Sequence, residues 1–266
     1  MSLACCRQKA DGPFFFVQVT DTQMGFREKH GEVERSVEYL SAIVDRINDL
    51  HPAFVVVTGD MVNNWNSSVQ LAAYDSLMSR IASDIPVYTI PGNHDYRPAK
   101  EPESAEAYHE HFGQETFCFE YHKSLFLGYN SCLIKEDDAE KEAAQYRWIV
   151  SQLEKYRPEV EHIFLFSHCA VVLEERDAAE DYFYYQEPYR SKYLKLCRDY
   201  NVDAVFSGHY HRTRSVTLDG TQYVTCTASG EPLGDGFTGI NTVGVWPSRF
   251  TWSVTSPADA VNPLRK

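Results

Sequence analysis

Polar clusters follow five short apolar segments of the 266-residue chain. They are Asp21 to Gln23, Gly59-Asp60, Gly92 to Asp95, Ser167-His168 and Gly208 to His211. Carboxylate and amide oxygens combined with imidazole nitrogens suit divalent ions such as manganese, iron or zinc. These clusters contain no cysteine, which argues against a purely thiophilic site. The residue types therefore predict a metal centre.

The apolar segments before the clusters are predicted strands of an α/β fold. Phe14 to Val19 and Phe54 to Thr58 are short apolar runs, whereas Val33 to Leu50 has apolar residues at steps of three and four, which predicts a helix. Alternating strands and helices indicate parallel βαβ units. Ligands of such sheets lie outside the carboxyl ends of the strands, so we expect all five clusters to meet in one crevice.

The later part of the chain continues the pattern. We expect strands at 86–90, 117–121, 125–129, 162–166 and 203–206, helices at 67–81, 140–156 and 190–200, a short helix ending at Phe112, and short strands from 212 to about 256. The aromatic run at 181–185 is expected to flank a surface cleft. A poorly ordered tail at 1–13, a single domain at 14–256 and a C-terminal tail at 257–266 are the expected organisation.

Each cluster also has an ordinary structural explanation when it is taken alone. Asp60 could cap the next helix, and residues 93–95 could form a turn. His168 could be a buried structural histidine, and His209 and His211 could stand in a surface loop. Five clusters in order, each at a predicted strand end, favour the metal centre over these alternatives.

The ordered set of residues resembles the five-block signature of the calcineurin-like metallophosphoesterases. The Asp-x-Gln start is most similar to the branch called calcineurin-like phosphoesterase domain-containing proteins, which includes protein serine/threonine phosphatases. The resemblance extends from about residue 14 to 212. It implies a four-layer α/β/β/α sandwich of two mixed sheets flanked by helices. It also implies two divalent metal ions, with manganese, iron or zinc expected and magnesium as a further option.

The resemblance also implies roles for individual residues. Asp21, Gln23 and His211 would belong to the first metal site, Asn93, His168 and His209 would bind the second ion, and Asp60 would bridge both. His94 would face the scissile bond and assist the leaving group, while a hydroxide shared by the two ions attacks phosphorus. Gln23 replaces a usual histidine, so the first site is expected to bind loosely or to prefer manganese or magnesium.

Four further positions are candidates for contacts with the substrate. Asn63 and Asn64 stand where the related protein phosphatases have an aspartate and a phosphate-binding arginine. The Asn63 amide could still orient His94 by hydrogen bonding. Arg97 and Arg212 follow two of the clusters directly and could supply a cation at the same rim, although ordinary surface arginines are an equal alternative.

Composition restricts the partners and the compartment. The chain has 25 Lys and Arg against 38 Asp and Glu, a net charge of −13, which argues against nucleic acid and anionic membranes as partners. Its seven cysteines form no CxxC pair and suggest no disulfide framework, so the cytoplasm is the default compartment. The sequence shows neither a membrane span nor a signal peptide. If the N-terminus is trimmed, Cys5 would resemble a lipidation site, and a lipoprotein or exported form is the alternative.

The function expected from these residues is phosphomonoester hydrolysis. A phosphorylated small molecule or a phosphoprotein is the expected substrate, and protein phosphoserine and phosphothreonine are among the candidates. A phosphodiesterase on the same core and a non-catalytic metal-binding scaffold are the alternatives. The sequence leaves the native metals and the oligomeric state open.

Overall fold

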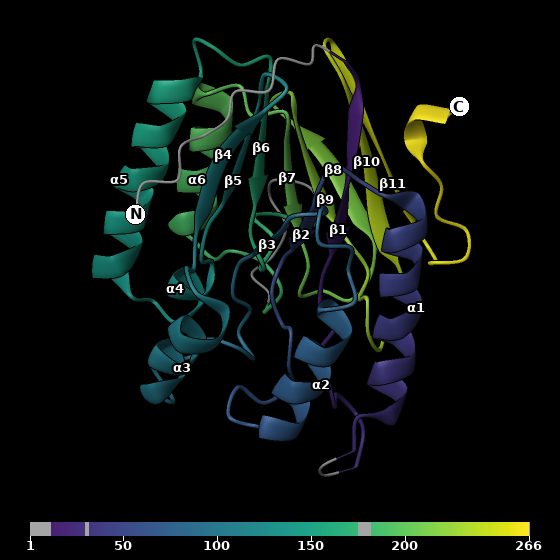
Figure 1. Ribbon diagram of the computed structural model, residues 1–266. Helices are drawn as coiled ribbons and strands as arrows, with labels where there is room; N and C mark the ends of the chain where they lie inside the picture. The colour runs from purple at the N-terminus through teal and green to yellow at the C-terminus, as the bar shows by residue number, and fades with distance from the viewer. Residues whose placement is uncertain (1–11, 30–31, 175–181, 266) are drawn as a thin grey trace.

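Two mixed sheets pack face to face in the protein (Figure 1). The structure is a computed structural model that describes residues 12–29, 32–174 and 182–265. Within these residues one sheet has the strand order β11-β10-β1-β2-β3 and the other β4-β5-β6-β7-β9-β8. The strands are β1 (Phe14–Val19), β2 (Val55–Val57), β3 (Val87–Thr89), β4 (Phe117–Tyr121), β5 (Ser124–Gly128), β6 (His162–Phe166), β7 (Ala204–Ser207), β8 (Arg214–Leu218), β9 (Thr221–Thr225), β10 (Ile240–Trp246) and β11 (Arg249–Thr255).

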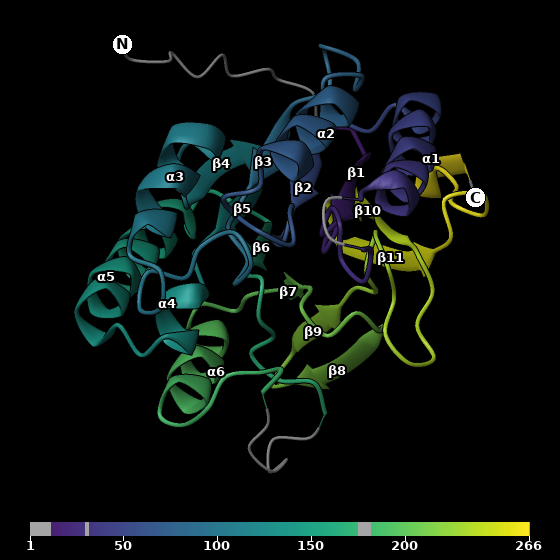
Figure 2. The ribbon, with the colours of Figure 1, turned by 90° about the horizontal axis from the view of Figure 1, so that it is seen from below.

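Helices cover the outer faces of both sheets. They are α1 (Glu34–Leu50), α2 (Ser68–Met78), α3 (Glu103–Phe112), α4 (Cys132–Lys135), α5 (Ala139–Tyr156) and α6 (Tyr189–Asp199), followed by a 3-10 turn, Pro263–Arg265. Helices α1 and α2 lie on the five-stranded sheet, and α5 and α6 lie on the six-stranded sheet (Figures 1 and 2). The expected four-layer α/β/β/α sandwich is confirmed.

The alternation of side chains along the strands sorts the apolar residues into three cores. Phe14 and Phe16 of β1 point into the space between the sheets, whereas Phe15 and Val17 pack under α1 and α2. Strand β6 repeats this division. Phe164 and Phe166 join the inter-sheet core, while Ile163 and Leu165 pack under α5 and α6. Strands buried on both faces are mostly apolar, as the sequence predicted, and the buried polar exceptions are Gln18 of β1 and His162 of β6.

Parallel pairing aligns the strand ends that precede the polar clusters. Strands β1, β2 and β3 pair in parallel, and so do β5, β6, β7 and β9. Their carboxyl ends point toward the same edge, the lower edge in Figure 1. The Gln18 side chain joins the two sheets there, since its amide donates to the carbonyl of Ser207 at 3.0 Å. The clusters are therefore positioned by the two sheets together.

The structure differs from the sequence expectation in some details. Helix α2 ends at Met78 rather than at 81, because Ser79 begins a tighter turn in which the amide of Arg80 bonds to Leu77. The four-residue helix α4 was not predicted, since it is too short to show a periodic pattern. Residues 257–265 pack on α1, where the guanidinium of Arg46 donates to the carbonyl of Ala260.

The expected N-terminal tail lies outside the described residues up to position 11, and with it Cys5. No described helix combines the length and the apolar character that crossing a membrane requires.

Candidate active site

Left-handed backbone turns bring the polar clusters together at the carboxyl ends of β1, β2, β3, β6 and β7, in the centre of the view in Figure 2. Five residues of these clusters have φ between 40° and 65°, namely Asp21, Gln23, Asp60, His209 and His211. This conformation costs a residue with a side chain about 1–2 kcal/mol. Backbone strain of this kind gathers at functional sites, where the fold holds it in place.

Two buried carboxylates, Asp21 and Asp60, form the centre of the group. Oδ2 of Asp60 lies 3.3 Å from Nε2 of His168, and Oδ1 of Asp21 lies 3.2 Å from Nε2 of His211. Burial alone would raise the pKa of each carboxyl, but the neighbouring histidines outweigh it and hold both pKa values below the usual range. Both carboxylates are therefore ionised at neutral pH.

Main-chain carbonyls orient two of the imidazoles. Nδ1 of His168 is 2.9 Å from the carbonyl oxygen of Thr58, and Nδ1 of His211 is 2.9 Å from that of Glu231. A proton on Nδ1 satisfies each carbonyl and leaves Nε2 to face the carboxylates. Nε2 of His168 is also 3.2 Å from Oδ1 of Asn93. Metal-ligating histidines commonly have a carbonyl oxygen at the ring nitrogen that does not face the metal, as His168 and His211 do here.

Two buried polar atoms of the group have no hydrogen-bond partner among the described residues, Oε1 of Gln23 and Nε2 of His209. Such an atom costs about 1–3 kcal/mol when nothing satisfies it. Burial, together with the charges of His168 and Lys135, holds the pKa of His209 well below its usual value, so its imidazole is neutral. Neutral imidazole and amide oxygen are ligands for a divalent cation, and the residues therefore fit metal ions.

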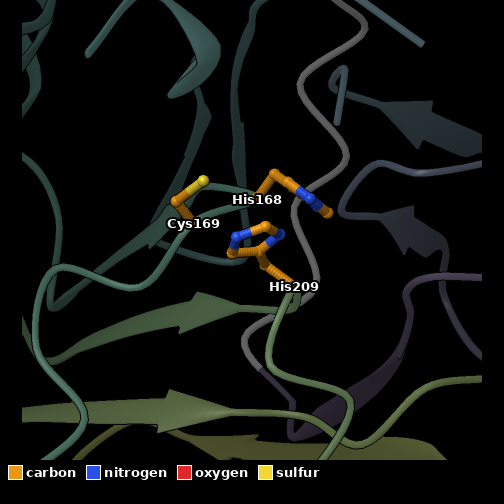
Figure 3. A group of neighbouring side chains, drawn as sticks. All are labelled: His168, Cys169 and His209. Atoms are coloured by element: carbon orange, nitrogen blue, oxygen red, sulfur yellow. The ribbon is translucent and has the colours of Figure 1, made fainter. Parts of the chain in front are cut away.

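The spacing of the donor atoms agrees with this chemistry. One ligand atom each from Asp21, Asp60 and His168 lie within 4.8 Å of one another. The same holds for His168, Cys169 and His209, which Figure 3 shows gathered beside one another. The thiol of Cys169 was not expected at this place, because no motif in the sequence marks it. We refer to Asp21, Gln23, Asp60, Asn93, His168, His209 and His211 as the strand-end cluster.

His94 stands at the border of the strand-end cluster and is half-buried. Its backbone amide donates to Oδ1 of Asp60 at 2.8 Å, and its ring Nδ1 is 2.8 Å from the main-chain carbonyl of Asn63. The sequence had suggested that the side-chain amide of Asn63 orients this ring. The contact is instead to the backbone, so any residue at 63 can make it.

Asp95 fastens two of the clusters to each other, a role that its place in the Gly-Asn-His-Asp motif did not reveal. Its buried carboxylate accepts hydrogen bonds from the amides of Met61, Val62 and Gly92 at 3.0–3.2 Å. Burial raises the pKa of Asp95 to about 7, and the charge of Asp60 adds to the rise while the amides oppose it. The loop after β2 and the loop after β3 thus both donate backbone hydrogen bonds to the Asp95 carboxylate.

The other candidates for substrate contacts are engaged elsewhere. The guanidinium of Arg212 donates to the carbonyl of Leu233 at 3.0 Å and lies 3.4 Å from Asp235. Nε of Arg97 is 3.4 Å from Glu101, and Asn64 is exposed. No described contact joins these three side chains to the strand-end cluster, and their substrate roles stay predictions.

A lysine that the sequence pattern did not indicate stands close to the cluster. Nζ of Lys135 is 3.2 Å from the centroid of the Tyr182 ring, and that ring is 5.0 Å from the ring of His209. Burial lowers the pKa of Lys135 below its usual value. Lys135 belongs to the short helix α4, where four residues cannot display a periodicity.

A family model described as calcineurin-like phosphoesterase matches residues 16–213, more than half of the chain. The chain belongs to this family. It is similar to the serine/threonine-protein phosphatase CPPED1 of Danio rerio, with 29% identity over 252 residues that cover 88% of the chain and 82% of that protein. A probable cyclic nucleotide phosphodiesterase of Rhodopseudomonas palustris is 42% identical over 87 residues, 32% of this chain and 30% of that protein.

The fold agrees with the calcineurin-like phosphoesterase assignment. The crystal structure of a dimetal phosphatase from Danio rerio superposes with a TM-score of 0.67 at 16% identity, covering 92% of this chain and 96% of that one. As a member of the calcineurin-like phosphoesterase family, the chain is a metal-dependent phosphoester hydrolase. The resemblance that the sequence motifs indicated is confirmed.

Proposed function

We propose that this phosphoesterase is a phosphomonoesterase acting on phosphoserine and phosphothreonine in proteins. The observation that carries the proposal is the meeting of ligand atoms from Asp21, Asp60 and His168 within 4.8 Å, beside buried donor atoms of Gln23 and His209 that lack a partner. The relatives named serine/threonine-protein phosphatase support the substrate class, because their similarity extends over most of the chain.

In this proposal the strand-end cluster holds two divalent ions. Asp21, Gln23 and His211 would bind one ion, Asn93, His168 and His209 would bind the other, and Asp60 would be shared. Two bound ions lower the pKa of a water molecule and neutralise charge on the transferring phosphoryl group. Oxygen and imidazole donors suit manganese, iron or zinc, and the amide oxygen of Gln23 favours manganese or magnesium at the first position.

His94 has the position and the chemistry of the residue that assists the leaving group. Its backbone is tied to Asp60, and its ring is held by the carbonyl of Asn63, so Nε2 is the ring nitrogen that can meet the ester oxygen. A protonated imidazole can act as a general acid and donate its proton to the departing alcohol. The residues of the cluster would hold the ions against which the phosphate binds.

The test compares hydrolysis of a phosphoserine peptide, p-nitrophenyl phosphate and bis(p-nitrophenyl) phosphate by the manganese-loaded protein. We expect faster turnover of both monoesters than of the diester. His94→Ala should lower kcat by about 10²–10⁴-fold. His51→Ala is the matched control, because the side-chain contact of His51 among the described residues is an exposed ion pair with Asp84.

A phosphodiesterase is the second candidate, favoured by the local similarity to the cyclic nucleotide phosphodiesterase of Rhodopseudomonas palustris. Preferential cleavage of the diester in the same experiment would replace the proposed function with this one. Absence of turnover for all three substrates in metal-loaded protein would instead support a metal-binding scaffold.

A further inference from the structure

A pocket of about 560 Å³ lies beside the strand-end cluster, between α4, the segment after β6 and the start of α6. Its walls include Lys135, Cys169, Tyr182, Tyr184, Tyr185 and Tyr189. This volume is in the range of pockets that bind small organic groups. Tyr182, Tyr184 and Tyr185 belong to the aromatic run that the sequence predicted to flank a cleft, whereas Asn63, Asn64, Arg97 and Arg212 do not line the pocket.

The pocket borders the strand-end cluster, where the phosphate would bind. Cys169 follows His168 in the chain, and its sulfur lies within 4.8 Å of one ring nitrogen each of His168 and His209. On the other wall, the ring of Tyr182 is 5.0 Å from the ring of His209. A group attached to a phosphate at the cluster can therefore enter the pocket directly.

The charged groups of the pocket are satisfied by other groups of the chain. The carboxylate of Asp137 accepts a hydrogen bond from the hydroxyl of Tyr189 at 2.9 Å, and that of Glu187 is 3.1 Å from Nε of Arg190. The ammonium of Lys135 lies over the Tyr182 ring and donates to the carbonyl of that residue. What remains for a ligand is mainly the faces of tyrosine rings.

These rings differ in how firmly they are held. Tyr184 and Tyr185 are buried, and the hydroxyl of Tyr185 donates to that of Tyr129 at 3.1 Å. Tyr182, by contrast, is 58% exposed, which leaves its ring accessible to a ligand. Aromatic rings bind other flat rings through stacked or edge-to-face contacts. Two carboxylates against one ammonium disfavour an anionic occupant.

We infer that this pocket receives the aromatic side chain of a residue next to the phosphoserine or phosphothreonine of the substrate. The inference rests on the proposed function. Neighbouring Cα atoms of a peptide are about 3.8 Å apart, so a side chain flanking the phosphorylated residue reaches a pocket that borders the strand-end cluster. The pocket thereby makes the enzyme selective for the sequence around the phosphate.

The experiment uses pairs of phosphoserine peptides that differ only in carrying phenylalanine or glycine at one flanking position, on either side. The reacting ester is the same in each pair, so the ratio of kcat/KM values reports the flanking residue alone. For manganese-loaded wild-type protein we expect a preference for phenylalanine of about tenfold on one side.

Three variants assign the preference to the pocket. Tyr182→Ala should bring the ratio close to one, whereas Tyr182→Phe, which keeps the ring, should preserve it. Tyr200→Ala is the matched control, because the hydroxyl of Tyr200, at the end of α6, contacts Glu154 of α5 and the residue does not line the pocket. A ratio near one in the wild-type protein for both flanking positions overturns the inference, and so does a preference that Tyr182→Ala leaves intact.

A binding measurement separates this inference from the proposed function. Calorimetry with non-hydrolysable phosphonate analogues of the same peptides gives the affinity ratio without any turnover. If the phosphopeptides bind but are not hydrolysed, the proposed function fails. The ratio of the affinities for the phenylalanine and glycine analogues then still tests whether the pocket binds the flanking side chain. Equal affinities of the phenylalanine and glycine analogues would refute the pocket's role even in an active phosphatase.

Discussion

Gln23 contributes an amide where an imidazole would be a stronger ligand. Its side chain is 1% exposed, its backbone has a φ of 40°, and its Oε1 has no partner among the described residues. An amide oxygen is a hard, neutral donor, which favours manganese or magnesium over zinc. Residue 23 is therefore the position at which metal preference can be altered with the least change of the site.

Gln23→His should shift the metal preference toward zinc. The imidazole adds a nitrogen donor at the same depth, and we expect zinc to bind about tenfold more tightly, equal to about 1.4 kcal/mol. Competition titrations of manganese and zinc against the metal-stripped variant measure this change. Gln114→His places the same residue type on an exposed loop as a control. An unchanged order of affinities would show that residue 23 does not reach the ion.

Residue types alone predicted the strand-end cluster but could not predict its supporting contacts. The motifs around Asp60 and His168 stand out because each follows an apolar strand, and the strand direction brings them together. Asp95 lies in the predicted cluster at 92–95, but nothing in the sequence indicates that it accepts from three backbone amides, and Cys169 and Lys135 give no signal of their own. Their places depend on packing between segments that are distant in the sequence, which no local pattern encodes.

At the scale of elements, two loops approach the carboxylates so closely that only glycine fits. A Cβ atom at position 208 would stand 1.9 Å from Oγ1 of Thr20 and 2.3 Å from Oδ2 of Asp21. A Cβ atom at position 92 would stand 2.1 Å from Oδ1 of Asp60. The turns after β3 and β7 can therefore press their backbone against the ligands of the neighbouring strands.

Gly208→Ala should weaken metal binding more than it weakens the fold. The added methyl group must push the Asp21 carboxylate aside, and the hydrogen bond from the His209 amide to that carboxylate, 2.9 Å long, would lengthen. We expect a loss of affinity at the first metal site of about tenfold, together with about 1–3 kcal/mol of stability.

Calorimetric metal titration and denaturant unfolding measure the two effects of the Gly208 substitution. Gly12→Ala is the control, because a Cβ at position 12 would meet no atom within 4 Å. Retention of wild-type metal affinity in Gly208→Ala would contradict the claim that this turn holds Asp21 in place.

Strands and helices could be predicted from the apolar pattern, whereas several helix ends and the backbone conformation of the turns could not. Strand β6 was predicted with its observed bounds, because a buried strand is a continuous apolar run. Helix α4 was not predicted, and α2 ends at Met78, three residues before the predicted end at 81. The left-handed backbone of Asp21 and His211 has no sequence signal, since glycine usually marks that conformation.

At the scale of the whole molecule, His162 links three strands of both sheets at the edge opposite the strand-end cluster. Its Nδ1 is 3.1 Å from Oδ1 of Asp203, which precedes β7, and its Nε2 is 2.8 Å from the carbonyl of Trp246 at the end of β10. Burial alone would lower the pKa of His162, but the bonds to Asp203 and Trp246 outweigh it and raise that pKa.

The contribution of His162 to stability should depend on pH. Because its pKa is higher in the folded state, the contribution is complete below the unfolded pKa of about 6.5 and is lost as the pH rises through the folded value. We expect His162→Gln to lower the free energy of unfolding by about 1–2 kcal/mol more at pH 5.5 than at pH 9.

Denaturant unfolding of both proteins across this pH range tests the His162 link. His51→Gln serves as the control, because the exposed pair of His51 with Asp84 contributes little. A difference between wild type and His162→Gln that stays constant with pH would contradict the role of the charged imidazole.

The layered architecture could be predicted from the sequence, but the order of the strands in each sheet could not. Alternating strands and helices imply parallel units with helices outside, and the family resemblance implied the second sheet. The placement of β10 and β11 beside β1 depends on an antiparallel return of the chain after some 200 residues, as in the pairing of Phe16 with Val243. Contacts over such a separation are settled by the packing of the whole inter-sheet core.

The central claim is that the strand-end cluster binds two ions and that catalysis requires both. The most direct measurement titrates manganese into metal-stripped protein and follows bound metal per chain together with hydrolysis of p-nitrophenyl phosphate. We predict that activity reaches its maximum only at two bound ions per chain, and that His94→Ala binds the same two ions with turnover lowered by about 10²–10⁴-fold. Full activity at one bound ion, or in protein without metal, would contradict the account.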